Sequence, residues 1–496
     1  MDNRPRSASI HVVDDDSLHH VFYFCRPFLL VRLGEDDITG PFGEHWTQNE
    51  RWWYALAHVC QRWRNIILGS AVSLDVSLVC AHGAPIADIL AHSPPLPLIV
   101  GYFTNILEPN TEEEGLIIAL KQRDRIRRLR LGNPAAIMQR LIMTMDEEYP
   151  ILGYLYTTLP VDDTGSILRF PETFQAPHLR KLTLVGFALP IGSRLLTTAV
   201  GLVTLQLGMV HPSTYFHPNT LLQWISLMPH LETLKIFFEF SISNRDVERQ
   251  FTHTPIIAPI TLPNLHRFHF RGVSTYLEAL VHRIVAPRLK KLQIKFFNQL
   301  TYSIPRFLQF IDPAENLRFG NAVLTFSDKL VGVGVSPYMV TNAYTISIVV
   351  KCLHLDWQVS SIAQISNSLN QIFSAVETLF LQHTVPIRSS EEHNEVNRTE
   401  WRKLFRPFGN VKSLWIENGF VSDLSRCLEL EDGELPLELL PELQVLRYYG
   451  NDDTGDAFAS FIDARRNSAR PVTLVRLHPP SSESSFETST HHTSEQ

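Results

Sequence analysis

One short phrase recurs twelve times along the chain, in the approximate form Pro-x-Leu-x-x-Leu-x-Leu. The last two apolar residues of the phrase alternate, so both side chains point to one face of a short strand. The proline lacks an N–H and ends the element before the strand. Such a repeat predicts a solenoid with a wide surface rather than a catalytic cleft. The copies begin at Ile126, Leu152, Leu179, Leu202, Leu231, Leu265, Leu289, Asn321, Val350, Val376, Val411 and Leu443.

Helical spacing of apolar residues separates several of these copies. It occurs over residues 219–228, where Asn219 is the expected N-cap, and again over 274–284 and 360–373. One strand and one helix per repeat, stacked in parallel, predict a curved α/β solenoid with the parallel sheet on its concave face. The alternative is a leucine-rich α/β domain with accidental spacing, which twelve copies in register disfavour.

A different pattern precedes the repeats and predicts a small helical module over residues 10–78. Asp14, Asp15 and Asp16 form an acidic helix start before an apolar stripe. A second stripe at spacings of three and four predicts one helix that ends at Gly69. Residues 33–51, rich in Gly, Asp and Glu, are expected to form a surface loop between the two stripes. The stripes comprise Leu18, Val21 and Phe22, and then Trp53, Leu56, Val59, Cys60, Trp63 and Ile67.

The segment Leu56-Ala57-His58-Val59-Cys60-Gln61-Arg62-Trp63-Arg64 resembles the second half of an F-box, and residues 13–22 resemble the first half. The phrases that follow resemble leucine-rich repeats. Together they look like the F-box and repeat proteins that are abundant in mushroom-forming fungi. The resemblance implies binding to a Skp-type adaptor of a cullin–RING ubiquitin ligase. It assigns that contact to Leu18, Val21, Phe22, Leu56, Val59, Cys60 and Trp63. The alternative is that Trp53, Leu56, Val59, Cys60 and Trp63 only form the core of the module.

Composition is that of an ordinary globular protein, with 44% hydrophobic and 19% charged residues. The net charge of −7 disfavours a nucleic-acid partner for the whole chain. The sequence contains no secretory signal and no apolar run long enough for a membrane span. Five scattered cysteines are typical of reduced thiols, so a cytoplasmic or nuclear location is expected. We expect a flexible segment over 1–9, the solenoid over 79–477 and a disordered tail over 478–496.

We find no motif for a catalytic nucleophile, a metal or a phosphate-binding loop, so the sequence predicts no enzyme, no cofactor and no metal site. One basic stretch, Lys121 to Arg130, has two possible explanations. It binds an acidic partner or nucleic acid, or it is a solvated rim around the apolar residues of the first repeat.

In each copy, the residue between the paired apolar positions is expected to face outward on the concave side. Large aromatic side chains and arginines among these residues are candidate anchors for a target protein. The alternative is that irregular late repeats place the aromatic ones in the core. The row comprises Arg130, Tyr156, Thr183, Gln206, Lys235, His269, Gln293, Thr325, His354, Phe380, Trp415 and Arg447. The candidate target-binding residues are Arg130, Lys235, His269, His354, Phe380, Trp415 and Arg447.

The sequence therefore favours a non-enzymatic adaptor, in which the N-terminal module binds the ligase and the repeats bind the protein to be ubiquitinated. The alternative is a stand-alone scaffold whose F-box-like module recruits no ligase. Val13-Asp14, in place of the usual Leu-Pro, and the loop over 33–51 favour this alternative. The intact Val-Cys-Gln-Arg-Trp-Arg segment opposes it.

Overall fold

A computed structural model describes the chain in two compact units. The first comprises Met1–Phe216 with Leu227–Leu231, and the second comprises His217–Ser226 with Glu232–Gln496. The expected terminal segments 1–9 and 478–496, and nearly all of the expected loop over 33–51, lie outside the described residues. These are 13–26, 51–81, 85–103, 113–159, 168–190, 192–210, 215–239, 258–299, 301–302, 304–311, 319–337, 344–383, 398–429, 438–449 and 457–477.

The N-terminal segment forms three helices, α1 (Asp15–Cys25), α3 (Trp52–Ala57) and α4 (Gln61–Gly69). Asp14 caps α1, since its carboxylate accepts from the Ser17 N–H at 2.7 Å. The expectation of one helix between Trp53 and Ile67 was wrong. Cys60 is extended and starts a new helix, because its sulfur accepts from the Trp63 N–H at 3.5 Å.

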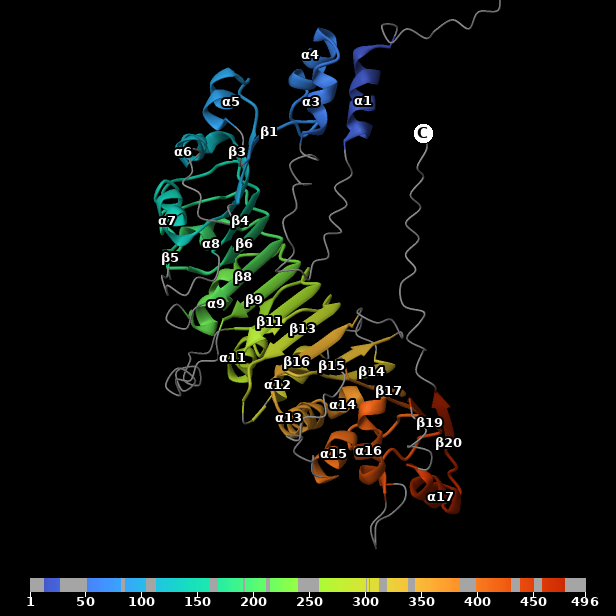
Figure 1. The fold of residues 1–496 in the computed structure, drawn as a ribbon. Helices are drawn as coiled ribbons and strands as arrows, with labels where there is room; N and C mark the ends of the chain where they lie inside the picture. The colour runs from blue at the N-terminus through green and yellow to red at the C-terminus, as the bar shows by residue number, and fades with distance from the viewer. Residues whose placement is uncertain are drawn as a thin grey trace, which may run out of the picture. The chain divides into compact units, whose positions relative to one another are not determined.

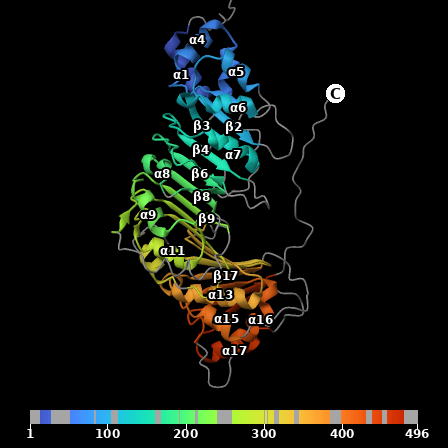
Figure 2. The same cartoon turned by 90° about the vertical axis from the view of Figure 1, so that its left-hand side faces the viewer.

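In the first unit, six parallel strands follow one another through the sheet. Helices between them lie on one face, as Figures 1 and 2 show. The first two strands precede the earliest copy of the phrase, and sequence analysis missed them. The strands are β1 (Leu78–Ala81), β2 (Leu98–Phe103), β3 (Ile126–Gly132), β4 (Tyr154–Thr158), β6 (Lys181–Val185) and β8 (Thr204–Val210). The helices are α5 (Ile86–His92), α6 (Glu113–Leu120), η2 (Arg123–Arg125), α7 (Ala135–Met143) and α8 (Arg194–Thr198), and β5 (Leu168–Arg169) pairs with β7 (Phe187–Ala188).

The second unit contains ten strands in one run, in the order β9, β11, β13, β16, β15, β14, β17, β18, β19, β20. Their bounds are β9 (Thr233–Phe238), β11 (Arg267–Gly272), β13 (Lys291–Phe296), β14 (Asn321–Phe326), β15 (Leu330–Ser336), β16 (Ile346–Lys351), β17 (Thr378–His383), β18 (Ser413–Ile416), β19 (Val445–Tyr449) and β20 (Thr473–Leu477). A short pair, β10 (Ile260–Thr261) and β12 (Ile284–Val285), lies apart from this run.

Helices connect the strands of the second unit. They are α9 (Pro218–Ser226), α11 (Ser274–Val281), α12 (Pro305–Ile311), α13 (Leu355–Ser368), α14 (Asn370–Phe373), α15 (Arg398–Phe405), η4 (Asn418–Phe420), α16 (Val421–Leu428) and α17 (Ala459–Asn467). The three expected helices correspond to α9, α11 and the pair α13 with α14. Asn219 is not the N-cap of α9, since that helix already includes Pro218.

The expected uniform parallel stack is interrupted, because β15 runs antiparallel to both β14 and β16. The chain leaves β13, forms β14, and returns through a tight turn in which Ser327 bonds to both backbone groups of Leu330. β16 then pairs with β13. The copies that we placed at Asn321 and Val350 were therefore out of register. Alternating apolar residues suit parallel and antiparallel strands equally, so the sequence pattern did not reveal the hairpin.

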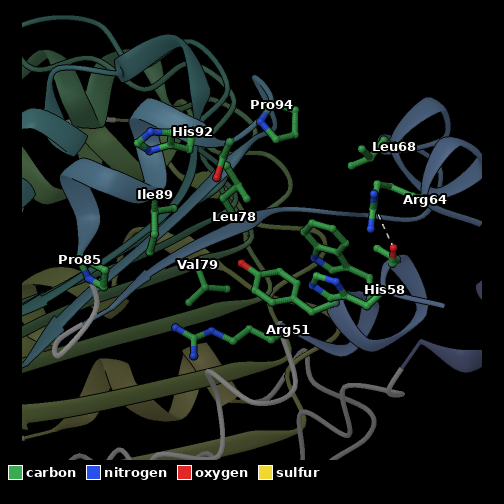
Figure 3. A pocket seen from close by; sticks show the side chains of 14 residues that line it. Arg51, His58, Arg64, Leu68, Leu78, Val79, Pro85, Ile89, His92 and Pro94 are labelled. Carbon is green, nitrogen blue, oxygen red and sulfur yellow. Dashed lines mark hydrogen bonds between the residues drawn. The ribbon is translucent and has the colours of Figure 1, made fainter. Parts of the chain in front are cut away.

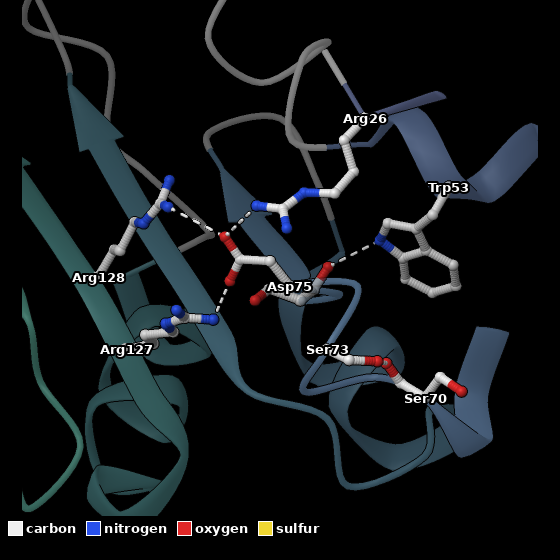
Figure 4. Close-up of polar contacts among 8 residues, drawn as sticks. Arg26, Trp53, Ser70, Ser73, Asp75, Arg127 and Arg128 are labelled. Carbon is white, nitrogen blue, oxygen red and sulfur yellow. Dashed lines mark hydrogen bonds and ion pairs between the residues drawn. The ribbon is translucent and has the colours of Figure 1, made fainter. Parts of the chain in front are cut away.

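Asp75 joins the helical segment to the sheet of the first unit (Figure 4). Its backbone is left-handed, with φ of +57°, and its side chain is largely buried. Its carboxylate contacts Arg26 at 3.2 Å, Arg128 at 3.5 Å and also Arg127. The Trp53 indole N–H donates to the Ser77 carbonyl at 3.1 Å nearby. The end of α1 and the start of β3 thus share one anionic group.

No helix in the described part of the chain is both long enough and apolar enough to cross a bilayer.

We expect Asp75→Asn to lower the local stability of the helical segment by about 1–3 kcal/mol, because three arginines lose a partly buried charged acceptor. Asparagine tolerates the left-handed backbone, so the change tests the charge rather than the turn. Hydrogen exchange of the α1 and α4 amides measures the effect. Asp463→Asn, which removes one exposed ion pair with Arg466, is the control and should change exchange little. Equal exchange in both variants would contradict the proposed role of Asp75.

Candidate protein-binding surface

One face of the second unit's sheet packs against helices. The Phe268 ring on β11 lies 5.9 Å from Phe310 of α12, and Phe326 on β14 lies 5.8 Å from Trp401 of α15. Side chains of successive strand residues point to opposite faces. The residues between these buried ones therefore lie on the other face, which no described helix covers in Figures 1 and 2. We call it the helix-free face.

Four side chains in register across neighbouring strands form an aromatic row on this face. Val323 is opposite Phe380, Phe380 is opposite Trp415, and Trp415 is opposite Arg447. All four are half-buried. The rings of Phe380 and Trp415 are stacked at 5.3 Å with 27° between their planes.

Arg447 completes the aromatic row at its far end. Its guanidinium carbon lies 4.8 Å from the Trp415 ring centre, within cation–π range. It also donates to the Ser413 hydroxyl at 2.7 Å. The row is thus held in position before any partner binds, which reduces the entropy cost of association. Tryptophan and arginine are the residues that most often dominate binding energy at protein interfaces.

Phe380 and Trp415 are the aromatic residues for which a surface position and a core position were both considered. They lie on the helix-free face and not in the core, whereas Trp401 is fully buried. Val323 rather than Thr325 occupies the row, because the hairpin shifts the register of β14 by two residues.

The other candidate target-binding residues differ from one another in burial. Arg130 is half-buried, with its guanidinium 5.9 Å and 5.8 Å from the rings of Tyr154 and Tyr156. Lys235 and His269 lie opposite each other on the helix-free side, but both are buried. The prediction that they are exposed was wrong, since only 8% of Lys235 and 4% of His269 is accessible to solvent.

His354 is not in the row at all. It lies at the start of α13, beside Trp357, with 5.5 Å between ring centres. Ser347 of β16 takes the expected position instead, because it pairs with Gln293 of β13. As at β14, the cause is the hairpin that contains the antiparallel strand β15.

The residues assigned to adaptor binding separate into three groups by burial. Leu18 and Phe22 are buried, and Phe22 packs edge-to-face on Trp63 at 4.9 Å. Val21 and Val59 are 50% and 59% exposed. The remaining three, Leu56, Cys60 and Trp63, are half-buried. The first group stabilises the helical segment, and only the exposed valines offer a large apolar surface.

A hollow of about 720 Å³ lies in the first unit between α3, β1 and α5 (Figure 3). Among the described residues, Arg51, His58, Arg64 and His92 line it together with Tyr54, Ser93 and apolar side chains, and none of these residues is a carboxylate. Arg64 already donates to the Ala57 carbonyl at 3.1 Å. The lining favours an anionic ligand, but the hollow is open and contains no catalytic pair.

Within the described residues, no group of three or more His, Cys, Asp or Glu side chains is arranged to hold a metal ion.

Comparison with known proteins adds little to this geometry. No protein-family model matches the chain, and no curated protein matches it. Among solved structures, a leucine-rich repeat-containing protein, LegL7 from Legionella pneumophila, is similar at 9% identity. The match covers 78% of this chain and 96% of that chain with a TM-score of 0.24. Functional interpretation therefore depends on the residues of this chain.

We expect Trp415→Ala to lower the free energy of unfolding by about 1 kcal/mol, because the ring is only half-buried. The matched variant Trp401→Ala should cost about 3–5 kcal/mol, because it empties a buried site. Urea unfolding curves of both variants measure the difference. A loss at Trp415 as large as that at Trp401 would place Trp415 among the core residues.

Proposed function

We propose that this protein is a non-enzymatic interaction scaffold that binds a partner protein on the helix-free face of its second unit. The observation that carries the proposal is the aromatic row, in which Phe380, Trp415 and Arg447 stack in register without being buried. A core would bury these rings, and a purely solvated surface would not order them. A preorganised row of this kind is suited to bury an apolar patch of another protein.

We further propose that the N-terminal helices bind a Skp-type adaptor, and through it a cullin–RING ubiquitin ligase. The resemblance of residues 56–64 to an F-box supports this proposal. The exposure of Val21 and Val59 also supports it, because apolar side chains on an otherwise packed helical segment favour a protein contact.

The resulting mechanism is proximity in the cytoplasm or nucleus. One protein would hold both the ligase and its target, which raises the effective concentration of the target near the transfer centre. The chain itself would carry out no covalent step.

The alternative is a scaffold that recruits no ligase. Val13-Asp14, at the position where the F-box family usually has Leu-Pro, favours it. Both functions use the helix-free face in the same way, so they differ only in what the N-terminal helices bind.

Co-purification of the full chain with a Skp-type adaptor distinguishes the two functions. We expect binding by the wild type and loss of binding in Val21→Asp/Val59→Asp, since both charges would lie in the contact. Val72→Asp is the matched control, because Val72 is 87% exposed in the same unit and has no assigned role. Thermal unfolding must show that all three proteins are folded. If the folded wild type binds no adaptor, the ligase function is contradicted and the scaffold that recruits no ligase remains.

A further inference from the structure

Acidic and basic residues are distributed unevenly among the strands of the second unit. The whole sequence has 51 acidic residues and 44 lysines and arginines. In contrast, β9, β11, β13 and β16 contain no aspartate or glutamate. Their cations are Lys235, Arg267, Arg271, Lys291, Lys295 and Lys351.

Three of these cations gather where β11, β13 and β16 end. Arg271 is directly opposite Lys295, and neighbouring strands are only about 4.8 Å apart. Lys351 ends β16, the next strand. Like charges opposite each other destabilise a sheet. We call Arg271, Lys295 and Lys351 the cationic edge.

Electrostatic effects within the cationic edge agree with this geometry. Burial, and then the charges of Arg271 and Lys351, lower the pKa of Lys295. Burial also lowers the pKa of Arg271, while the Glu239 carboxylate opposes that change. Among the described residues, these three cations and the Glu239 carboxylate leave an excess of positive charge. An added anion would relieve the repulsion that the fold tolerates here.

A hollow of about 320 Å³, lined by Glu239, Asn298 and His354 as well as by apolar side chains, adjoins the cationic edge. Lys351 belongs to both, and Phe297 follows β13 directly and lies under the Arg271 guanidinium at 5.6 Å. Leu353 and Trp357 also line the hollow, and they remain 64% and 53% exposed. The volume is at the low end for a ligand site, so it suits one side chain rather than a large molecule.

We propose that the cationic edge and this hollow bind an acidic protein segment that carries an apolar side chain. Carboxylates of the segment would contact Arg271, Lys295 and Lys351, and the apolar side chain would enter beside Leu353 and Trp357. The inference rests on the proposed function, since it assigns the chemistry of the partner on the same sheet. Charge complementarity selects an acidic occupant. The net charge of −7 disfavours the extended phosphate backbone of a nucleic acid.

A display library of random 16-residue peptides, selected on the full-length protein, tests the inference. Enriched peptides should combine several Asp or Glu residues with one large apolar residue. For the best peptide, Lys295→Gln/Lys351→Gln should weaken binding about tenfold, since each lost contact is worth up to about 1 kcal/mol. Weaker binding at higher salt should accompany this.

Three further variants make the result specific. Trp357→Ala should remove the apolar preference and keep the acidic one. Lys290→Gln/Arg406→Gln removes two exposed cations away from the edge and should leave binding unchanged. Trp415→Ala shows whether a peptide binds at the aromatic row instead of the cationic edge.

Several outcomes would overturn the inference. Peptides without acidic residues that depend on Trp415 would overturn it and leave the proposed function intact. Acidic peptides that bind the Lys295→Gln/Lys351→Gln variant as tightly as the wild type would place the anion site elsewhere. Binding of a 16-nucleotide oligothymidylate that competes with the best peptide and is weakened by the same variant would point to nucleic acid. No enrichment at all would overturn both proposals.

Discussion

The in-register strand ladder is the constraint on which the rest of this structure depends. Each strand places every second side chain against the helices, and the ladder aligns these side chains from strand to strand. The buried side brings together leucines and phenylalanines from distant parts of the chain. The same alignment forces the intervening residues into rows on the opposite face. Phe380, Trp415 and Arg447 meet only because three repeats share one register.

Charge is distributed along this face in two different ways. Near the carboxyl-terminal end of the unit, a single guanidinium is matched to an aromatic ring and a hydroxyl. At the ends of β11, β13 and β16, cations face one another with little compensation. The first arrangement stabilises the isolated protein, whereas the second costs stability. The second arrangement is therefore more informative about a partner, because Glu239 offsets only part of the repulsion among these cations.

The helical segment shows the limit of motif resemblance. Leu18 and Phe22 have the residue types that the F-box resemblance requires, yet the structure uses them to pack α1 on α4. Val21 and Val59 occupy the same motif and are exposed. A motif thus combines residues that build the module with residues that are accessible for contact. Asp75 then links this segment to β3 through three arginines, a connection that no local pattern indicates.

Much of the fold was predictable because it depends on local periodicity. The alternating Leu-x-Leu phrase identified the strands that begin near Leu179 or Leu289, and apolar spacing identified helices such as α9 and α11. The complete lack of acidic residues in β9, β11, β13 and β16 was also visible in the sequence. The sequence alone does not show that Arg271 and Lys295 are opposite each other, because that depends on the order and register of the strands.

The sequence by itself determined which residues alternate, and therefore which could share a face. Only the tertiary structure decided which strands are neighbours. The antiparallel strand β15 displaced two repeats, moved His354 out of the row and brought Val323 into it. The tertiary structure also decided exposure, since Lys235 and His269 lie on the expected face of the sheet but are buried. Strand order and burial both depend on contacts between distant segments, and periodicity within one segment carries no record of those contacts.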